Sequence, residues 1–278
     1  MRVLMWNCRG LGRPLTVHNM KGICRSHSTE ICFFYEIKNQ SCQVKRKLRA
    51  SGFNYWFLRD PMGTAGGLTL AWKEGCVVEV FTSNDFFIVA RVKDTKKNVD
   101  WGMVGVYLSY SDQIRRGQFE EVASVLDMLT GRVLIFGDFN AISRQHEKVR
   151  GSTKSPTSIN DFNEFIDENS LKDLGMIGRP FTWSNRRLGQ ELIEERLDRM
   201  MAGVDWLDVY LNATVTRLSE DGSDHAPLIL NTSPSAHRSK RRFKFQEWWC
   251  GVEEIKHRIR EAWSTRNSLV GIIWSSIS

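Results

Sequence analysis

Short apolar runs, each bounded by glycine or polar residues, recur along residues 1–233. They are rich in β-branched and aromatic side chains, which favours strands over helices. The runs are RVLMWN (2–7), EICFFYE (30–36), FNYWFL (53–58), GGLTLAW (66–72), VVEVFT (77–82), FFIVARV (86–92), MVGVYL (103–108), RVLIFG (132–137), FTWSN (181–185), RLDRM (196–200) and APLILN (226–231). Ten or more short strands are too many for one open sheet, so the pattern predicts two packed sheets.

Helical periodicity appears at three places between these runs. Residues 113–129 and 158–169 repeat apolar side chains every three or four positions, and residues 15–27 do so more weakly. Ser158, followed three residues later by Asp161, resembles a capping box at a helix N-terminus. Helices that lie between the strands of a two-sheet core predict an α/β fold, a layered sandwich with the helices outside.

The pattern changes after Pro234. The segment SPSAHRSKRRFKF is polar and basic, and an apolar stripe at helical spacing follows it over residues 252–263. Such an isolated amphipathic helix has no core of its own. We therefore divide the chain into a domain of residues 1–233 and a basic linker with one helix in residues 234–278.

Composition is that of an ordinary globular protein of 278 residues, 41% hydrophobic and 26% charged. No run of about 18 apolar residues predicts a membrane span, and the first ten residues lack the pattern of a secretory signal. The scattered cysteines include no CxxC pair, which indicates neither a zinc site nor a disulfide framework. We expect an intracellular protein with no membrane partner, and nothing indicates an obligate protein partner.

The net charge says little about the function of the chain. Of the overall +7, residues 234–278 supply nine Lys/Arg against four Asp/Glu, which leaves 30 basic and 28 acidic residues in 1–233. A modestly basic protein can bind nucleic acid through its phosphates, but many metabolic enzymes are equally basic. The basic KRRFK (240–244) is a weak nuclear signal.

Polar residues stand at the ends of the predicted strands. These residues are Asn7, Glu36, Asp138, Asn140 and the pair Asp224–His225. Loops that begin at rigid strand ends are where sites are usually built. A carboxylate among apolar strands is costly unless it is paired or binds a cation. Carboxylates and amides that converge there predict a hard-oxygen site for Mg²⁺ or Mn²⁺.

Each motif taken alone has a simpler interpretation. GDFN (137–140) aims Asp138 and Asn140 to one side, but the same residue types are typical of hairpin turns. Asp198 in RLDR could hold a histidine in one tautomer or form a surface ion pair. The simpler interpretations of the others are a polar loop for Asp224–His225, a core position for Tyr107, a strand cap for Glu36 and a turn for Asn7.

In combination the motifs resemble the endonuclease/exonuclease/phosphatase superfamily. WNCRGLG, YEIK, GVY, GDFN, ERLDR and SDHAPL occur in its order and approximate spacing over residues 1–232. WNCRGLG, GGLTLAW, PFTWSN and ERLDR together are most similar to the endonuclease domain of plant LINE-type retrotransposons, and FKFQEWW resembles its connector to a reverse transcriptase. The resemblance implies a four-layer αββα sandwich of two mixed β-sheets flanked by helices.

The resemblance also implies a role for each candidate residue. Glu36 would be the principal ligand of Mg²⁺ or Mn²⁺, aided by Asp224, while Asn7 would hold the metal-site network or a phosphate oxygen. Asp138 would orient or deprotonate the attacking water. Asn140 and Tyr107 would contact the scissile phosphate, and His225, positioned by Asp198, would donate to its developing negative charge.

Four departures separate the chain from the abasic-site repair enzymes of that superfamily. Arg9 stands where those enzymes carry Asp, Ile37 replaces a Thr, LSY follows Tyr107 in place of an Asn, and Glu195 replaces a Trp. These differences disfavour an abasic-site specialist. We expect a divalent-metal-dependent phosphodiesterase that nicks DNA. The alternatives are a phosphatase acting on inositol phosphate, lipid or RNA, and an idle retroelement remnant that only binds nucleic acid.

Overall fold

The computed structural model describes residues 1–61, 63, 66–129, 131–219, 221–234, 253 and 257. The chain divides into two compact units, Met1–Pro234 and Ser235–Ser278. The predicted basic linker and its helix lie almost wholly outside the described residues. The first unit contains all the elements discussed below.

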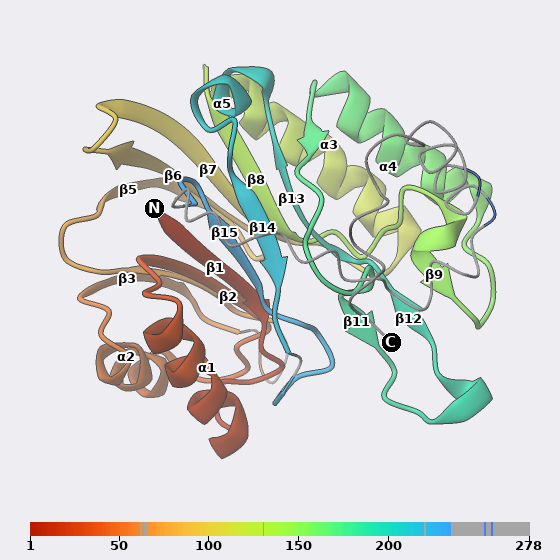
Figure 1. Cartoon of the computed structure of the whole chain (residues 1–278), viewed down its shortest axis with the longest axis horizontal. Coiled ribbons are helices and arrows are strands. Elements are labelled where there is room, and N and C mark those ends of the chain that lie inside the picture. Colours follow the sequence, from red (N-terminus) through yellow and green to blue (C-terminus); the bar gives the residue numbers. More distant parts are fainter. Residues whose placement is uncertain are drawn as a thin grey trace, which may run out of the picture. The chain divides into compact units, whose positions relative to one another are not determined.

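Two six-stranded mixed sheets form the centre of the first unit (Figure 1). The first has the order β14-β15-β1-β2-β4-β3 and the second β10-β13-β8-β7-β6-β5. The strands are β1 (Arg2–Asn7), β2 (Ile31–Tyr35), β3 (Tyr55–Arg59), β4 (Leu68–Trp72), β5 (Val77–Ser83), β6 (Phe87–Asp94), β7 (Val99–Tyr107), β8 (Val133–Asp138), β10 (Lys172–Asp173), β13 (Asp198–Ala202), β14 (Thr214–Arg217) and β15 (Leu228–Asn231). A small third sheet joins β9 (Lys148–Val149), β11 (Trp183–Ser184) and β12 (Glu194–Glu195).

Helices cover the outer face of each large sheet (Figure 1). The helices are α1 (Pro14–Ser26), α2 (Ser41–Ala50), α3 (Asp112–Met128), α4 (Pro156–Glu168) and α5 (Val204–Val209), with 3₁₀ turns η1 (Gln145–Glu147) and η2 (Gly189–Glu191). Strand alternation explains the layering: Val3 and Met5 of β1 enter the core between the sheets, whereas Leu4 and Trp6 pack with α1 and α2. The helices α3 and α4 share a separate core with the second sheet. This arrangement confirms the four-layer αββα sandwich.

The predicted strands and the three predicted helices are confirmed, but two helices were not predicted. The segment that forms α2 has four basic residues among its ten and buries only Val44 and Leu48, so its apolar stripe is too narrow to stand out. The six-residue α5 is shorter than two helical turns. Over the described residues, no helix is both long and apolar enough to cross a membrane.

The predicted capping box at Ser158 is wrong. Ser155 is the N-cap of α4, Pro156 opens the helix, and the Ser155 hydroxyl accepts the backbone N–H of Ser158. The Ser158 hydroxyl instead meets Arg115 of α3 at 2.8 Å. The two helices on this face are therefore joined by a buried polar contact at the position that resembled a cap.

The two arginines of RLDR form a partly buried ion network on the side of β13 that carries no candidate site residue. Arg199 binds Glu147 and, at 2.7 Å, Asp173, and Arg196 binds the same two carboxylates at 3.3 and 2.8 Å. Burial by itself raises the pKa of Glu147, but the nearby Arg199, with Arg196, lowers it to about 2. This network fastens η1 to β13 and β10.

We expect Glu147→Gln to lower the free energy of unfolding by roughly 3 kcal/mol at pH 7, because it leaves the buried Arg199 with only the partly exposed Asp173 as a counter-charge. The pKa of Glu147 is lower in the folded than in the unfolded state. Its stabilisation is therefore complete above pH 4.5 and lost as the pH falls toward 2. Urea unfolding of wild type and variant between pH 3 and 7 measures both effects. Glu164→Gln, at an exposed position of α4, is the control; equal stability of Glu147→Gln and wild type would contradict the prediction.

Candidate active site

In each large sheet a parallel pair of strands ends in polar residues at the same edge. Asn7 is the last residue of β1 and Glu36 follows β2, while Tyr107 ends β7 and Asp138 ends β8. Both pairs run parallel, with Asn7 opposite Tyr35 and Tyr107 opposite Asp138. Packing of β1 against β8 brings the two edges together, and Asn7 Nδ2 donates to Asp138 Oδ2 at 3.2 Å. The site therefore lies at one end of both sheets.

The backbone at these strand ends is unusual. Glu36 and Asn140 adopt left-handed conformations with φ of 56° and 48°. Gly137 has φ of 146°, and a Cβ there would lie 1.9 Å from the carbonyl oxygen of Val106. Only glycine allows β8 to approach β7 this closely just before Asp138. Non-glycine residues in sparsely populated conformations cluster at functional sites, and here two of the candidate residues are among them.

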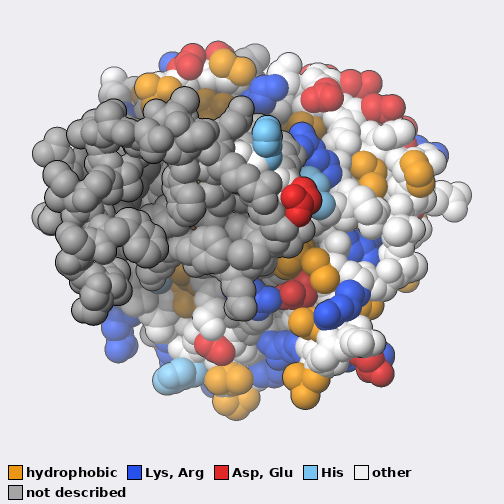
Figure 2. All heavy atoms as spheres, turned by 45° about the vertical axis from the view of Figure 1, so that its right-hand side comes forward, with side chains coloured by type: hydrophobic (Ala, Val, Ile, Leu, Met, Phe, Trp, Pro, Cys, Tyr) orange, Lys and Arg blue, Asp and Glu red, His pale blue; other side chains and the backbone are white. Residues whose placement is uncertain are grey.

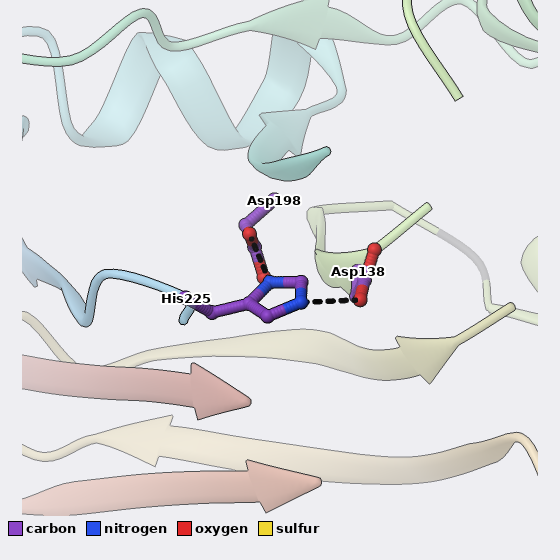
Figure 3. A group of neighbouring side chains, drawn as sticks. All are labelled: Asp138, Asp198 and His225. Atoms are coloured by element: carbon purple, nitrogen blue, oxygen red, sulfur yellow. Dashed lines mark hydrogen bonds and ion pairs between the residues drawn. The ribbon is translucent and has the colours of Figure 1, made fainter. Parts of the chain in front are cut away.

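Asp198 and His225 reach the site through antiparallel pairing. Asp198 lies opposite Asp138 across β13 and β8, and His225 precedes β15, which pairs with β1. His225 Nδ1 lies 2.9 Å from Asp198 Oδ2, and its Nε2 lies 3.8 Å from Asp138 Oδ2 (Figure 3). The hydroxyl of Tyr35 donates to the other oxygen of Asp198. Because Asp198 is buried, the surface ion-pair interpretation of this residue is wrong.

Burial and mutual charge set the protonation of this cluster. Burial, together with the neighbouring carboxylate of Asp198, raises the pKa of Asp138 to about 7. Burial opposes the charged form of His225, but Asp198 and Asp138 outweigh it and raise the pKa of His225 to about 9. The imidazole is therefore a cation at neutral pH, fixed between two carboxyl groups. Ligand atoms of these three residues lie within 4.8 Å of one another, but a protonated ring cannot ligate a metal, so the arrangement suits proton transfer and charge stabilisation.

Glu36 and Asp224 face a common cation, the side chain of Arg9. Arg9 Nε lies 3.1 Å from Glu36 Oε2 and 3.0 Å from Asp224 Oδ1. Lys38 Nζ lies 2.9 Å from Glu36 Oε1, and the indole N–H of Trp183 donates to Asp224 Oδ2 at 3.0 Å. Glu36 Oε2 is buried and makes no hydrogen bond. Two carboxylates that converge on one position, with a buried oxygen that lacks a donor, fit the hard-oxygen ligands of Mg²⁺ or Mn²⁺.

Asn140 and Tyr107 are the remaining candidate site residues. The backbone N–H of Asn140 donates to Asp138 Oδ1 at 3.0 Å and its side chain donates to the carbonyl oxygen of Leu108 at 2.7 Å, so Asn140 fastens the GDFN turn. Tyr107 is half-buried, and burial with the charges of Glu36 and Asp138 raises its pKa far above the ordinary value. The phenol therefore stays protonated and able to donate a hydrogen bond.

Seven of the eight predicted residues thus form two adjoining groups, and the eighth, Tyr107, lies opposite Asp138 at the end of β7. Asn7, Asp138, Asn140, Asp198 and His225 are linked by hydrogen bonds or close ion pairs, and Glu36 and Asp224 are joined through Arg9. The groups meet at Asn7, whose side-chain oxygen accepts the Arg9 N–H and whose backbone oxygen accepts the hydroxyl of Ser223. The contacts of Arg9, Tyr35 and Trp183 were not predicted from the sequence. Arg9 had a signal, since it stands where related motifs carry a carboxylate.

Comparison with known proteins agrees with this fold. No protein-family model matches the chain, and no curated protein sequence matches it. The endonuclease domain of TRAS1, a telomere-specific non-LTR retrotransposon, is 18% identical with a TM-score of 0.62, over 83% of this chain and 97% of that domain. The 3′ phosphatase NExo from Neisseria, bound to a product DNA hairpin, is 17% identical with a TM-score of 0.65, over 83% and 98%. The AP endonuclease LMAP from Leishmania major is 13% identical with a TM-score of 0.63, over 82% and 86%. The chain therefore has the same fold as these three proteins, as the motif series predicted.

Proposed function

We propose that this chain is a divalent-metal-dependent phosphodiesterase that nicks DNA. The observation that carries the proposal is the meeting of two groups at one end of both sheets. One is the Asp198–His225–Asp138 cluster, and the other is the carboxylate pair of Glu36 and Asp224. The similarly folded proteins include a retrotransposon endonuclease domain and an AP endonuclease, which supports a phosphodiester as the bond that is broken.

In this proposal Glu36 and Asp224 hold Mg²⁺ or Mn²⁺, which when bound supplies positive charge to the phosphoryl oxygens. Asp138 accepts a proton from the attacking water, and a pKa of about 7 suits a base that works near neutral pH. Protonated His225, oriented by Asp198, donates toward the negative charge that develops on the phosphate. Asn7 helps to hold the metal-site network or a phosphate oxygen.

Asn140 and Tyr107 act on the phosphate as neutral hydrogen-bond donors. Water adds to phosphorus and the bond from phosphorus to the 3′ oxygen breaks. The 3′ oxygen takes up a proton from solvent and Asp138 releases to solvent the proton that it took from the water, so the nick leaves a 3′-hydroxyl and a 5′-phosphate. A 3′-hydroxyl is the end that a reverse transcriptase could extend.

The same site could act on a smaller phosphate ester, and the surface charge bears on this alternative. In the view of Figure 2, the Lys and Arg side chains of the described residues lie among acidic and hydrophobic ones. Residues 1–233 carry a net charge of only +2, so a large share of the affinity for DNA is assigned to the basic residues 238–244. We favour DNA over a small phosphate ester because the similarly folded proteins include an AP endonuclease and a 3′ phosphatase bound to a product DNA hairpin.

Supercoiled plasmid tests the proposal directly. We expect conversion to the relaxed circle with Mg²⁺ or Mn²⁺, none with EDTA, and nicks that a polymerase extends without prior treatment. Release of inorganic phosphate from inositol phosphates, lipid headgroups or phosphorylated RNA, without nicking, would identify a phosphatase instead. A protein that circular dichroism shows to be folded, but that is inactive on every substrate, would be the idle remnant. The proposal would then be wrong.

A further inference from the structure

We propose that Arg9 is an internal counter-cation that occupies the position between Glu36 and Asp224 and must leave it when a divalent metal binds there. The inference rests on the proposed function, because that function assigns the two carboxylates to the metal. It adds a residue that sets how tightly the metal is held. A competing cation built into the chain makes the metal-binding step a replacement of one positive charge by another.

The backbone after β1 places Arg9 in this position. Arg9 adopts a left-handed conformation with φ of 47°, and its N–H donates to Asn7 Oδ1 at 3.3 Å. A non-glycine residue in this region is strained unless the surroundings hold it there. The turn directs the side chain back across the strand ends, where Nε lies within 3.1 Å of both carboxylates.

Charge at this position is balanced without a metal. Glu36 and Asp224 contribute two negative charges, and Arg9 and Lys38 contribute two positive charges. Lys38 contacts Glu36, whereas Arg9 contacts both carboxylates. A divalent cation that binds both carboxylates therefore needs the space and the charge partners that Arg9 now holds, while Lys38 can remain on the opposite oxygen of Glu36.

The contacts of Arg9 are those of a displaceable cation. They are made through Nε, and this buried atom lacks the geometry of a hydrogen bond. Its side chain is 37% exposed, so the guanidinium can move toward solvent without opening the core. Arg199 is a contrast within the same chain: it is 1% exposed and binds Glu147 and Asp173 through its two terminal nitrogens. Arg199 thus uses a separate nitrogen for each carboxylate, and such directional bonds resist displacement, whereas Arg9 faces both carboxylates through the single Nε.

Titration of the full chain with Mn²⁺ tests the proposal. Binding is measured by the loss of the free-ion signal in electron paramagnetic resonance. We expect Arg9→Gln to bind Mn²⁺ about tenfold more tightly than wild type, since two partly exposed ion pairs no longer have to be broken. Lys38→Gln should tighten binding less. Arg132→Gln removes the same charge at the opposite end of β8 and should leave the dissociation constant unchanged.

Thermal unfolding supplies an independent readout. Without metal, Arg9→Gln should have a lower Tm than wild type, because Glu36 and Asp224 then repel each other with only Lys38 nearby. Saturating Mn²⁺ should raise the Tm of the variant more than that of wild type. The metal-free loss and the metal-dependent gain have opposite signs, so a general defect in folding cannot imitate both.

Equal or weaker Mn²⁺ binding by Arg9→Gln, in a wild-type protein that binds Mn²⁺ and nicks plasmid, would overturn the role of Arg9 and leave the proposed function intact. Tightening of the same size in Arg132→Gln would also overturn it, because the effect would then be one of net charge. Absence of both binding and nicking in wild type and Arg9→Gln would overturn the proposed function together with the inference.

Discussion

Asp138→Asn should lower the single-turnover rate of plasmid nicking about a thousandfold, within the range that general-base catalysis contributes. An amide cannot accept the proton of the attacking water. The fold should persist, because the amide oxygen of the new side chain can still accept the Asn140 N–H at the same position. Quantification of relaxed plasmid at saturating metal measures the rate.

Asp127→Asn is the matched control, since Asp127 is exposed near the end of α3. The pH profile adds a second criterion. Asp138 has a pKa of about 7 and works as a carboxylate, so the wild-type rate should rise with pH up to and through 7. That acid limb should disappear in Asp138→Asn. Retention of the full rate, or of the limb, would show that another group takes the proton.

Asp198→Asn should lower the nicking rate about a hundred- to a thousandfold through its effect on His225. Asp198 is the strongest of the groups that raise the pKa of His225, and burial opposes the charged ring. Without Asp198, the pKa of His225 should fall well below 9 and the ring should lose its proton near neutral pH. Nuclear magnetic resonance titration of the His225 ring in the metal-free protein measures this shift, and nicking assays measure its consequence.

Tyr35→Phe separates the charge of Asp198 from its orientation. The Tyr35 hydroxyl donates to Asp198, so its removal loosens the carboxylate but keeps the charge beside His225. We expect a smaller loss of rate and a His225 pKa that remains raised. If Asp198→Asn left the pKa of His225 near 9, Asp138 alone would have to hold the proton, and the positioning role of Asp198 would be wrong.

The residues of the candidate site could be predicted from the sequence, but most of the contacts between them could not. Asn7, Glu36 and Asp138 could be found because each follows an apolar run, and a strand end is visible in local sequence. That these residues form one site was predicted by resemblance. Six motifs occur in the order of the superfamily, although no single motif is informative. The contact of Arg9 with both Glu36 and Asp224 was not predicted. The motif indicated only that Arg9 stands where related proteins carry a carboxylate.

By itself, then, the sequence determined most of the strands, three of the helices and the two-sheet core, but not the short strands β9, β10, β12 and β14. Alternation and helical periodicity record which face of a segment is buried, and that information is local. Tertiary structure decided which residues meet. Asn7 and Asp138 are 131 positions apart, and Tyr35 and Asp198 are 163 apart. Their contacts, and the pKa values that follow, exist only because the two sheets pack with the ends of their parallel strands side by side.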